Sequence, residues 1–167
     1  LEQQTRQLQL NPHFIYNAIA NLQGLIGDQQ TERANSYLVA FSQFIRKQLE
    51  LNREETITLQ EEIEAIEIYV KLQQMRYENR FTFHVKTDLD TEAYLIPPML
   101  IQPFVENAIE HGFKNINYQG VLTLTIEEKG NKLHLILIDN GNGKGVSNPH
   151  KKSLSKLITQ ERLELLF

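Results

Sequence analysis

The hydrophobic pattern of this 167-residue chain changes its period near residue 80, which limits the folds open to it. Before that point apolar residues recur every three or four positions, as they do in helices that bury one face. Beyond it, the stretches FTFHVKT and VLTLTIEE alternate apolar and polar residues, which is typical of half-buried strands. A helical segment followed by a mixed segment predicts an α+β protein with a boundary near residue 80.

Three helices are expected in residues 1–80. Thr58 and Glu61 have the spacing of a capping box and should begin the third helix. The first two helices form a hairpin with too little core to be stable alone, so we expect it to dimerise into a bundle. The expected apolar faces are Ile15, Ile19, Leu22 and Ile26 in the first helix, Leu38, Phe41, Ile45 and Leu49 in the second, and Ile63, Ile66 and Val70 in the third.

The second half of the chain should contain strands and two helices. A strand is predicted over residues 80–88, and a hairpin over residues 120–141 should turn through Gly130-Asn131. A helix is expected within residues 97–113, where Pro103 must lie in the first turns or produce a kink. Residues 153–167 are amphipathic and predict a closing helix.

Composition excludes several classes of function. The 17 basic and 21 acidic residues give a net charge of −4, which argues against nucleic acid as the main partner. The absence of cysteine excludes disulfides, Cys-ligated zinc and thiol nucleophiles. No apolar run has the length of a membrane span. The chain starts at Leu1 within a helical pattern, so we interpret it as part of a longer protein.

The stretch LNPHFIYNA places a Pro-His pair at the edge of a helical pattern. In one interpretation Asn11 caps the helix, Pro12 is its first residue, and His13 simply faces solvent. In the other, Pro12 bends the helix and fixes how His13 is presented as a phosphoryl acceptor, since its imidazole is largely neutral near pH 7. Asn17 lies one turn further along the same face.

The stretch PFVENAIEHG inserts polar residues into an otherwise apolar helix. Asn107 and His111 are spaced i, i+4, and Glu110 lies at i+3 from Asn107, so we expect one polar face. An amide oxygen can bind Mg²⁺, and a carboxylate such as Glu106 can accept a proton or orient water. The alternative is an ordinary amphipathic surface helix.

The stretch LILIDNGNGKG ends an apolar strand at Asp139 and continues with Gly141, Gly143 and Gly145. A carboxylate at a strand end suits the exocyclic amine of adenine, and glycine-rich backbone can donate N–H groups to phosphates. The pattern matches neither the P-loop nor the dinucleotide fingerprint. Taken alone, it is also what a simple turn looks like.

Together, and in this order, the three stretches resemble the bacterial sensor histidine kinases of the LytS/YehU type, over essentially the whole chain. LNPHFIYNAIANL is similar to their phosphoacceptor segment. IPPMLIQPFVENAIEHG resembles the N box, and IDNGNGKG the G1 box, of ATPases of the gyrase/Hsp90/kinase/MutL class. The resemblance implies a helical dimerisation and phosphotransfer region over residues 1–80. It also implies a Bergerat-type α/β sandwich that binds ATP over residues 81–167, without its final strands.

The resemblance also implies roles for the polar residues, with ATP and Mg²⁺ as cofactors. His13 matches the phosphorylated histidine, and Asn17 would either position water for dephosphorylation or hydrogen-bond His13. Glu106 would be an acid/base or water-orienting group. Asn107 would bind Mg²⁺, and His111 would lie near the phosphates. Asp139 would bind adenine, and Gly141 and Gly143 would be the glycines of the adjoining loop.

Three positions depart from the family pattern. Many histidine kinases place an acidic residue directly after the histidine, where this chain has Phe14. Glu110 occupies a position where many relatives carry lysine. The glycine motif of the ATP lid is replaced by a serine-containing segment around residues 150–155.

The function that this resemblance implies is ATP-dependent autophosphorylation of a histidine, followed by transfer to an aspartate of a response regulator. The protein would act as a homodimer, as the cytoplasmic portion of a membrane-anchored bacterial inner-membrane sensor. One alternative is a catalytically silent module that binds ATP and dimerises. Another is a purely helical signalling scaffold, which leaves the three polar stretches unexplained.

Overall fold

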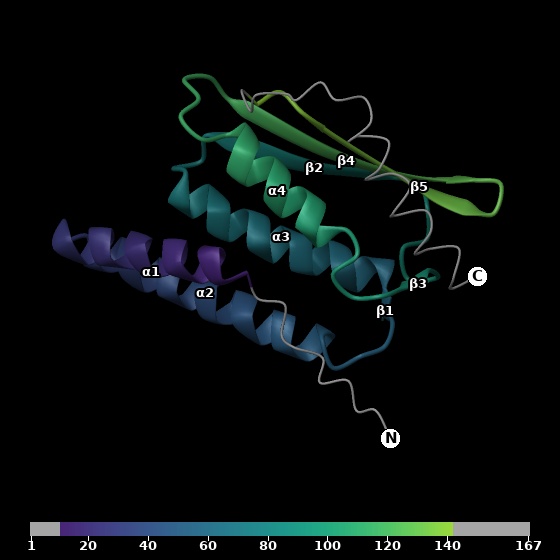
Figure 1. Ribbon diagram of the computed structural model, residues 1–167, viewed down its shortest axis with the longest axis horizontal. Helices are drawn as coiled ribbons and strands as arrows, with labels where there is room; N and C mark the ends of the chain where they lie inside the picture. Colours follow the sequence, from purple (N-terminus) through teal and green to yellow (C-terminus); the bar gives the residue numbers. More distant parts are fainter. Residues whose placement is uncertain (1–10, 142–167) are drawn as a thin grey trace.

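The computed structural model describes residues 11–141, and Figure 1 shows them as three layers. A helical hairpin lies on one side, two further helices lie in the middle, and a sheet covers those two helices on the other side. The mixture of helices and sheet confirms the α+β class. The helix expected over residues 153–167 lies outside the described residues. In chain order the elements are α1 (Pro12–Gly27), α2 (Thr31–Leu51), β1 (Ile57–Thr58), α3 (Leu59–Arg76), β2 (Phe81–Thr87), β3 (Leu95–Ile96), α4 (Gln102–Gly112), β4 (Gly120–Lys129) and β5 (Lys132–Asp139).

The main sheet has the strand order β2-β4-β5, with β2 parallel to β4 and β4 antiparallel to β5. The predicted strand and hairpin are therefore confirmed. The hairpin turns at Gly130, whose φ of 67° lies in the region that favours glycine. The register pairs Leu122 with Asp139, so Asp139 ends β5 directly beside the central strand.

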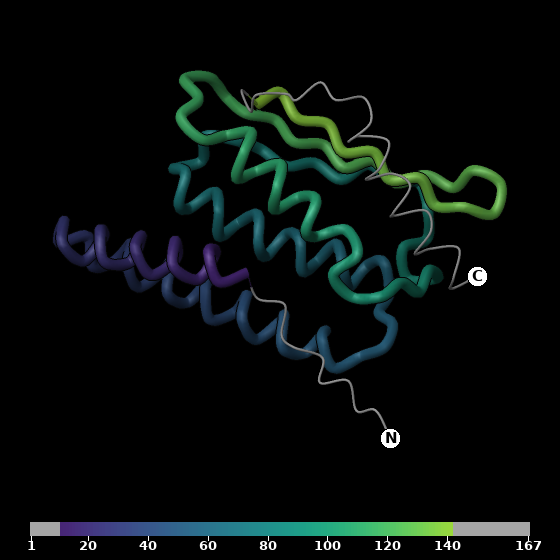
Figure 2. The backbone as a smooth tube through the Cα atoms, in the orientation of Figure 1, coloured from purple at the N-terminus to yellow at the C-terminus, as the bar shows by residue number. Residues whose placement is uncertain are grey.

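The core is built around α3. A hydrophobic cluster extends from Phe14 and Phe44 in the hairpin, through Ile66 and Leu72 of α3, to Leu124 in the sheet. Helix α3 packs against α2 on one side and against α4 and β2 on the other. Figure 2 shows α3 and α4 running side by side beneath the sheet. The division of the chain at residue 80 stays a prediction, and α3 contacts elements on both sides of it.

The buried faces of the first two helices differ from those expected. Phe14 and Ala18 are the buried residues of α1, whereas Ile19 and Ile26 are 44% and 66% exposed. In α2 the predicted core residue Leu38 is likewise 48% exposed. The difference arises because large aromatic rings occupy the inner faces of α1 and α2. Both helices are therefore rotated about their axes relative to the predicted orientation. The predicted face of α3 is correct: Ile63, Ile66 and Val70 are buried.

The predicted capping box begins α3. The Oγ1 atom of Thr58 accepts a hydrogen bond from the backbone N–H of Glu61 at 3.1 Å. The Oε2 atom of Glu61 accepts from the backbone N–H of Thr58 at 2.8 Å. Two N–H groups that a helix start leaves unpaired are thereby satisfied.

Replacing Thr58 with alanine should lower the free energy of unfolding by about 1 kcal/mol, because one helix-start N–H loses its acceptor. The melting temperature should fall by about 2–4 °C, which calorimetry can measure. Thr31→Ala, at the exposed first position of α2, is the control and should change stability by less than about 0.5 kcal/mol. Equal losses in the two variants would contradict the capping role.

Candidate functional site

Helix α1 begins immediately before His13. Asn11 is the N-cap, and its side chain accepts a hydrogen bond from the backbone N–H of His13 at 3.1 Å. Pro12 occupies the first helical position, where its missing N–H costs nothing. In the described residues Pro12 thus begins a helix, as in the first of the two interpretations. The His13 side chain is 69% exposed and so accessible.

Two side chains lie beside the Nδ1 atom of His13. The Nδ2 atom of Asn17, one turn along α1, is 3.2 Å away. The Oε2 atom of Glu110, which belongs to α4, is 3.5 Å away. The sequence predicted the neighbour from the same helix. It did not predict the carboxylate, which comes from the helix that resembles the N box.

Phe14 is an anchor for α1. Its ring centroid lies 4.9 Å from that of Phe44 in α2 and 5.4 Å from that of Tyr69 in α3. Pairs at these distances contribute roughly 0.5–1.5 kcal/mol each beyond the apolar area they bury. The position after His13 is therefore committed to packing, and a carboxylate there would be buried without a partner.

Helix α4 divides its polar residues between two faces, where the sequence predicted one. Asn107 and His111 are exposed and lie one turn apart. Glu106 and Glu110 are half-buried on the neighbouring face, which is turned toward α1 and α3. The four residues are thus close in space, but Asn107 and His111 face solvent whereas Glu106 and Glu110 face the neighbouring helices.

Glu106 belongs to a chain of side-chain hydrogen bonds. The Nε2 atom of Gln48 in α2 donates to Oε1 of Gln102 at 2.9 Å. The Nε2 atom of Gln102 then donates to Oε1 of Glu106 at 2.8 Å. Burial raises the pKa of Glu106, and the charges of Glu110 and Glu62 add to that effect, while the bond from Gln102 opposes it. A carboxyl that holds its proton to a higher pH than usual is a better candidate for acid/base work than an ordinary one.

Glu62 of α3 positions the start of α4, a role that no local sequence pattern predicts. Its side chain is fully buried. It accepts hydrogen bonds from the backbone N–H groups of Met99, Ile101 and Gln102 at 3.0, 2.9 and 3.2 Å. The N-cap residue of α4, Ile101, provides no capping side chain itself. A partner so distant in sequence leaves no local spacing to recognise.

Asp139 meets the end of α4 through two glycines. Its Oδ1 atom accepts a hydrogen bond from the backbone N–H of Gly141 at 2.9 Å. A Cβ atom at Gly112 would lie 3.3 Å from that same oxygen, and one at Gly141 would lie 2.3 Å from the carbonyl oxygen of Gly112. The approach at Gly141 therefore excludes a Cβ atom, and at Gly112 a Cβ atom would make a tight contact. Gly143 lies outside the described residues.

The donors present fit an adenine nucleotide with Mg²⁺. Asp139 is an exposed carboxylate at a strand end, beside backbone that carries no side chains. Within residues 11–141 no group of three His, Asp or Glu side chains could enclose a metal ion. Mg²⁺ needs no such group, since it usually keeps several waters and takes one or two protein ligands plus phosphate oxygens. The amide of Asn107 is a suitable single ligand.

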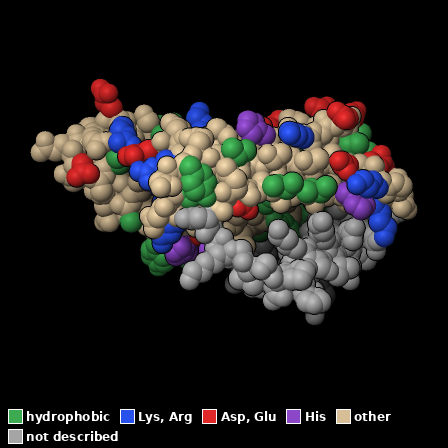
Figure 3. Space-filling view, turned by 90° about the horizontal axis from the view of Figure 1, so that it is seen from above, with side chains coloured by type: hydrophobic (Ala, Val, Ile, Leu, Met, Phe, Trp, Pro, Cys, Tyr) green, Lys and Arg blue, Asp and Glu red, His purple; other side chains and the backbone are tan. Residues whose placement is uncertain are grey.

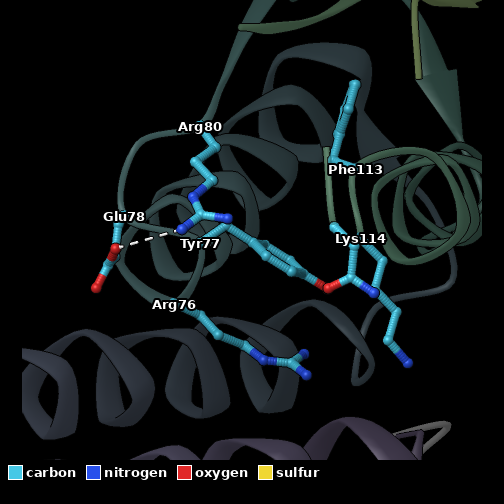
Figure 4. A pocket seen from close by; sticks show the side chains of 7 residues that line it. Arg76, Tyr77, Glu78, Arg80, Phe113 and Lys114 are labelled. Carbon is cyan, nitrogen blue, oxygen red and sulfur yellow. Dashed lines mark ion pairs between the residues drawn. The ribbon is translucent and has the colours of Figure 1, made fainter. Parts of the chain in front are cut away.

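A cavity of about 360 Å³ lies at the carboxyl ends of α3 and α4 (Figure 4). Arg80 and Glu78 form an ion pair across 3.8 Å at its edge, and Arg76 lies over the ring of Tyr77. Lys114 faces them from the segment that follows α4. None of the predicted site residues lines this cavity, and the clustered charges in MRYENR are its one signal in the sequence.

In the part of the chain that the structure describes, no helix is both long enough and apolar enough to cross a membrane.

Comparisons with known proteins give consistent matches. The histidine kinase family model matches residues 1–81. The sensor protein LytS of Staphylococcus epidermidis is 40% identical over 137 residues, which are 82% of this chain and 23% of that protein. The LytS of Oceanobacillus iheyensis is 35% identical over 140 residues, with coverage of 82% and 23%. A Staphylococcus aureus protein named sensor histidine kinase/phosphatase LytS is 35% identical over 138 residues, with coverage of 82% and 24%.

Among solved structures, the histidine kinase ThkA, crystallised in complex with the response regulator protein TrrA, aligns with a TM-score of 0.43 at 15% identity, over 86% of this chain and 47% of that one. The chain spans 23–24% of the length of the curated relatives named above. Over that segment, the family model and the relatives agree. Over the matched residues, this chain is similar to the LytS-type sensor histidine kinases.

Proposed function

We propose that this chain is the catalytic portion of a two-component sensor kinase that transfers the γ-phosphoryl group of ATP to His13. The observation that carries the proposal is the contact between α1 and α4. Helix α4 places Glu110 3.5 Å from His13, and the same helix exposes Asn107 on its neighbouring face. The accessible imidazole and the proposed nucleotide helix are therefore already in contact. Phosphoryl transfer depends mainly on such positioning and on charge neutralisation.

The proposed nucleotide site uses residues in the C-terminal half of α4 and at the end of β5. Asn107 would hold Mg²⁺, and His111, one turn further on the same exposed face, would contact phosphate. Asp139 would accept a hydrogen bond from the adenine amine, and the backbone at Gly141 would lie against the nucleotide. Glu106, whose pKa burial raises, would act as the acid/base or water-orienting group.

The exposed apolar face of the helical hairpin supports a homodimer. Ile19 and Ile26, predicted to be buried, are exposed instead, and so is Tyr16 at 71%. On α2, Leu38 and Val39 are 48% and 58% exposed. Large apolar side chains exposed on both helices are typical of an interaction site, and a second copy of the hairpin would cover them in a four-helix bundle.

The proposed partner in signalling is the receiver domain of a response regulator, whose aspartate would take the phosphoryl group.

The curated relatives are named as sensor proteins, which supports a membrane-anchored parent with this chain on the cytoplasmic side of the inner membrane. The Staphylococcus aureus relative is named as a kinase and phosphatase. In this chain Asn17 would position the water for dephosphorylation. On the face that Figure 3 shows, acidic and basic side chains are interspersed, unlike the basic patch that is typical of a nucleic-acid-binding surface.

A catalytically silent module that binds ATP and dimerises is the second candidate. It is favoured by Glu110, because a carboxylate that lies beside His13 cannot supply the positive charge that lysine gives at this position in many relatives. A labelling experiment separates the two candidates.

The chain should be incubated with Mg·[γ-³²P]ATP beside its His13→Gln and His84→Gln variants. Phosphohistidine is acid-labile, so the label should survive base and disappear in acid. It should be absent from His13→Gln and persist in His84→Gln, because His84 is a different exposed histidine, on β2. An absence of label while ATP still binds would favour the silent module. Label that persists in His13→Gln would refute His13 as the acceptor.

A further inference from the structure

We infer that Glu110 is the positioning residue of the phosphoacceptor: it holds the proton of the His13 ring on Nδ1, so that Nε2 is the nucleophile. The inference rests on the proposed function and deepens it. A neutral imidazole carries one proton on either nitrogen, and the neighbour of one nitrogen decides which. In serine hydrolases a carboxylate on Nδ1 performs this task for the catalytic histidine.

The contact between the two side chains is specific. The Oε2 atom of Glu110 lies 3.5 Å from Nδ1 of His13, and a movement of about half an ångström would bring it within ordinary hydrogen-bond distance. The other oxygen, Oε1, is buried without a hydrogen-bond partner. A buried carboxylate oxygen without a partner is uncommon, and it calls for a donor to the group. Among the described residues, His13 is the side chain whose ring nitrogen approaches this carboxylate, and it does so at Oε2 rather than at the unpartnered Oε1.

No other described acidic group is placed to do this. The position directly after His13 is occupied by Phe14, which is packed among aromatic rings. Glu106, one turn before Glu110, accepts from Gln102 instead. The charge of Glu110 also acts on Tyr69 and Tyr77 of α3. Burial is the main cause that raises the pKa of each tyrosine, and the charge of Glu110 raises it further.

Asn17 competes with Glu110 for the same ring atom. Its Nδ2 atom lies 3.2 Å from Nδ1 and 3.5 Å from Nε2. An amide N–H can donate only to a bare ring nitrogen, so the shorter contact would place the ring proton on Nε2 and block that atom as a nucleophile. Glu110 requires the opposite tautomer. A charged acceptor makes roughly twice as strong a hydrogen bond as a neutral group, so the tautomer that Glu110 favours should dominate. Asn17 can then turn its amide oxygen toward the ring.

The proposed step balances as follows. The Nε2 lone pair of His13 forms a bond to the γ-phosphorus, while the bond between that phosphorus and the β–γ bridging oxygen breaks and its electron pair leaves with ADP. The Nδ1 proton passes to Oε2 of Glu110, which leaves the phosphorylated ring uncharged. This role also explains the departure from lysine, because Glu110 faces His13 and not the exposed face of Asn107 and His111.

The first test reads the tautomer without any nucleotide. Long-range ¹H–¹⁵N spectra of the chain with ¹⁵N-labelled imidazoles should show His13, assigned through His13→Gln, mainly as the Nδ1–H form at a pH where the ring is neutral. Glu110→Gln should move the population toward Nε2–H. Glu64→Gln, which removes an exposed carboxylate of α3 paired with Lys47, should not. A tautomer ratio that Glu110→Gln leaves unchanged would overturn the inference.

The second test uses phosphoramidate, a small phosphoryl donor that needs no ATP site. The chain should be phosphorylated on Nε2 of His13, as ³¹P spectra can establish. Glu110→Gln should slow the reaction by about 100-fold, the lower end of what proton-handling groups contribute, and Glu110→Asp should restore part of the rate. A rate that is equal or faster in Glu110→Gln would refute the positioning role. If phosphoramidate labels His13 in this Glu110-dependent way but ATP does not, the inference stands and the proposed kinase activity fails.

Discussion

Replacing Asp139 with alanine should abolish the protection that ATP gives against thermal unfolding. The carboxylate lies exposed at the end of β5, where it can accept from the adenine amine, and it also holds the backbone N–H of Gly141 at 2.9 Å. The change would therefore remove both the proposed contact with adenine and the hydrogen bond to Gly141. A ligand present at 100 times its Kd stabilises the folded state by about 2.7 kcal/mol, so the loss should be plain in melting curves.

The measurement compares melting temperatures with and without Mg·ATP. Asp88→Ala, an exposed carboxylate just after β2, is the matched control and should keep the full shift. GTP should give the original chain little protection, because guanine presents a carbonyl oxygen where adenine presents an amine, and sites built for one partner reject the other strongly. Full ATP protection in Asp139→Ala would refute the adenine-reading role.

Replacing Glu62 with alanine should give the largest loss of stability. Three backbone N–H groups, those of Met99, Ile101 and Gln102, would lose their acceptor in the interior. Each unsatisfied buried group costs about 1–3 kcal/mol, so we expect the free energy of unfolding to fall by at least about 3 kcal/mol. The melting temperature should then fall by about 10 °C.

Urea unfolding of Glu62→Ala beside Glu67→Ala, an exposed residue of the same helix, measures this effect. A loss below about 1 kcal/mol would contradict the capping role of Glu62. The dependence on pH gives a second check, because burial raises the pKa of Glu62 above its ordinary value of 4.5. The folded state then binds the proton more tightly than the unfolded state. The stability of the original chain, relative to Glu62→Gln, should therefore fall as pH rises from 4.5 through that raised pKa.

The parts of the fold that sequence could predict are those encoded locally. The capping box of Thr58 and Glu61 and the turn at Gly130 depend on residues a few positions apart, and both were found where expected. The faces of α1 and α2 were predicted only in part, because packing of Phe14 on Phe44 and Tyr69 decides them. That packing joins three helices and has no periodic signature in any one of them.

The candidate site shows the same division. The stretches around His13, Asn107 and Asp139 stood out by residue type and spacing alone. The contact of Glu110 with His13 did not, since it depends on how α4 lies against α1. Glu62 likewise has acidic neighbours in α3, as surface residues commonly do, and only the packing of α3 against α4 shows that its side chain is fully buried.

Because α3 packs against α2 on one side and against α4 on the other, the hairpin and the sheet share an element. If the α3–α4 and α2–α3 contacts are coupled, a ligand whose affinity depends on the first contact also shifts the equilibrium of the second. The coupling free energy between the two contacts is the same in both directions. A signal that repositions the hairpin would then change nucleotide affinity by the factor with which nucleotide changes the hairpin. Measuring either effect therefore measures the other.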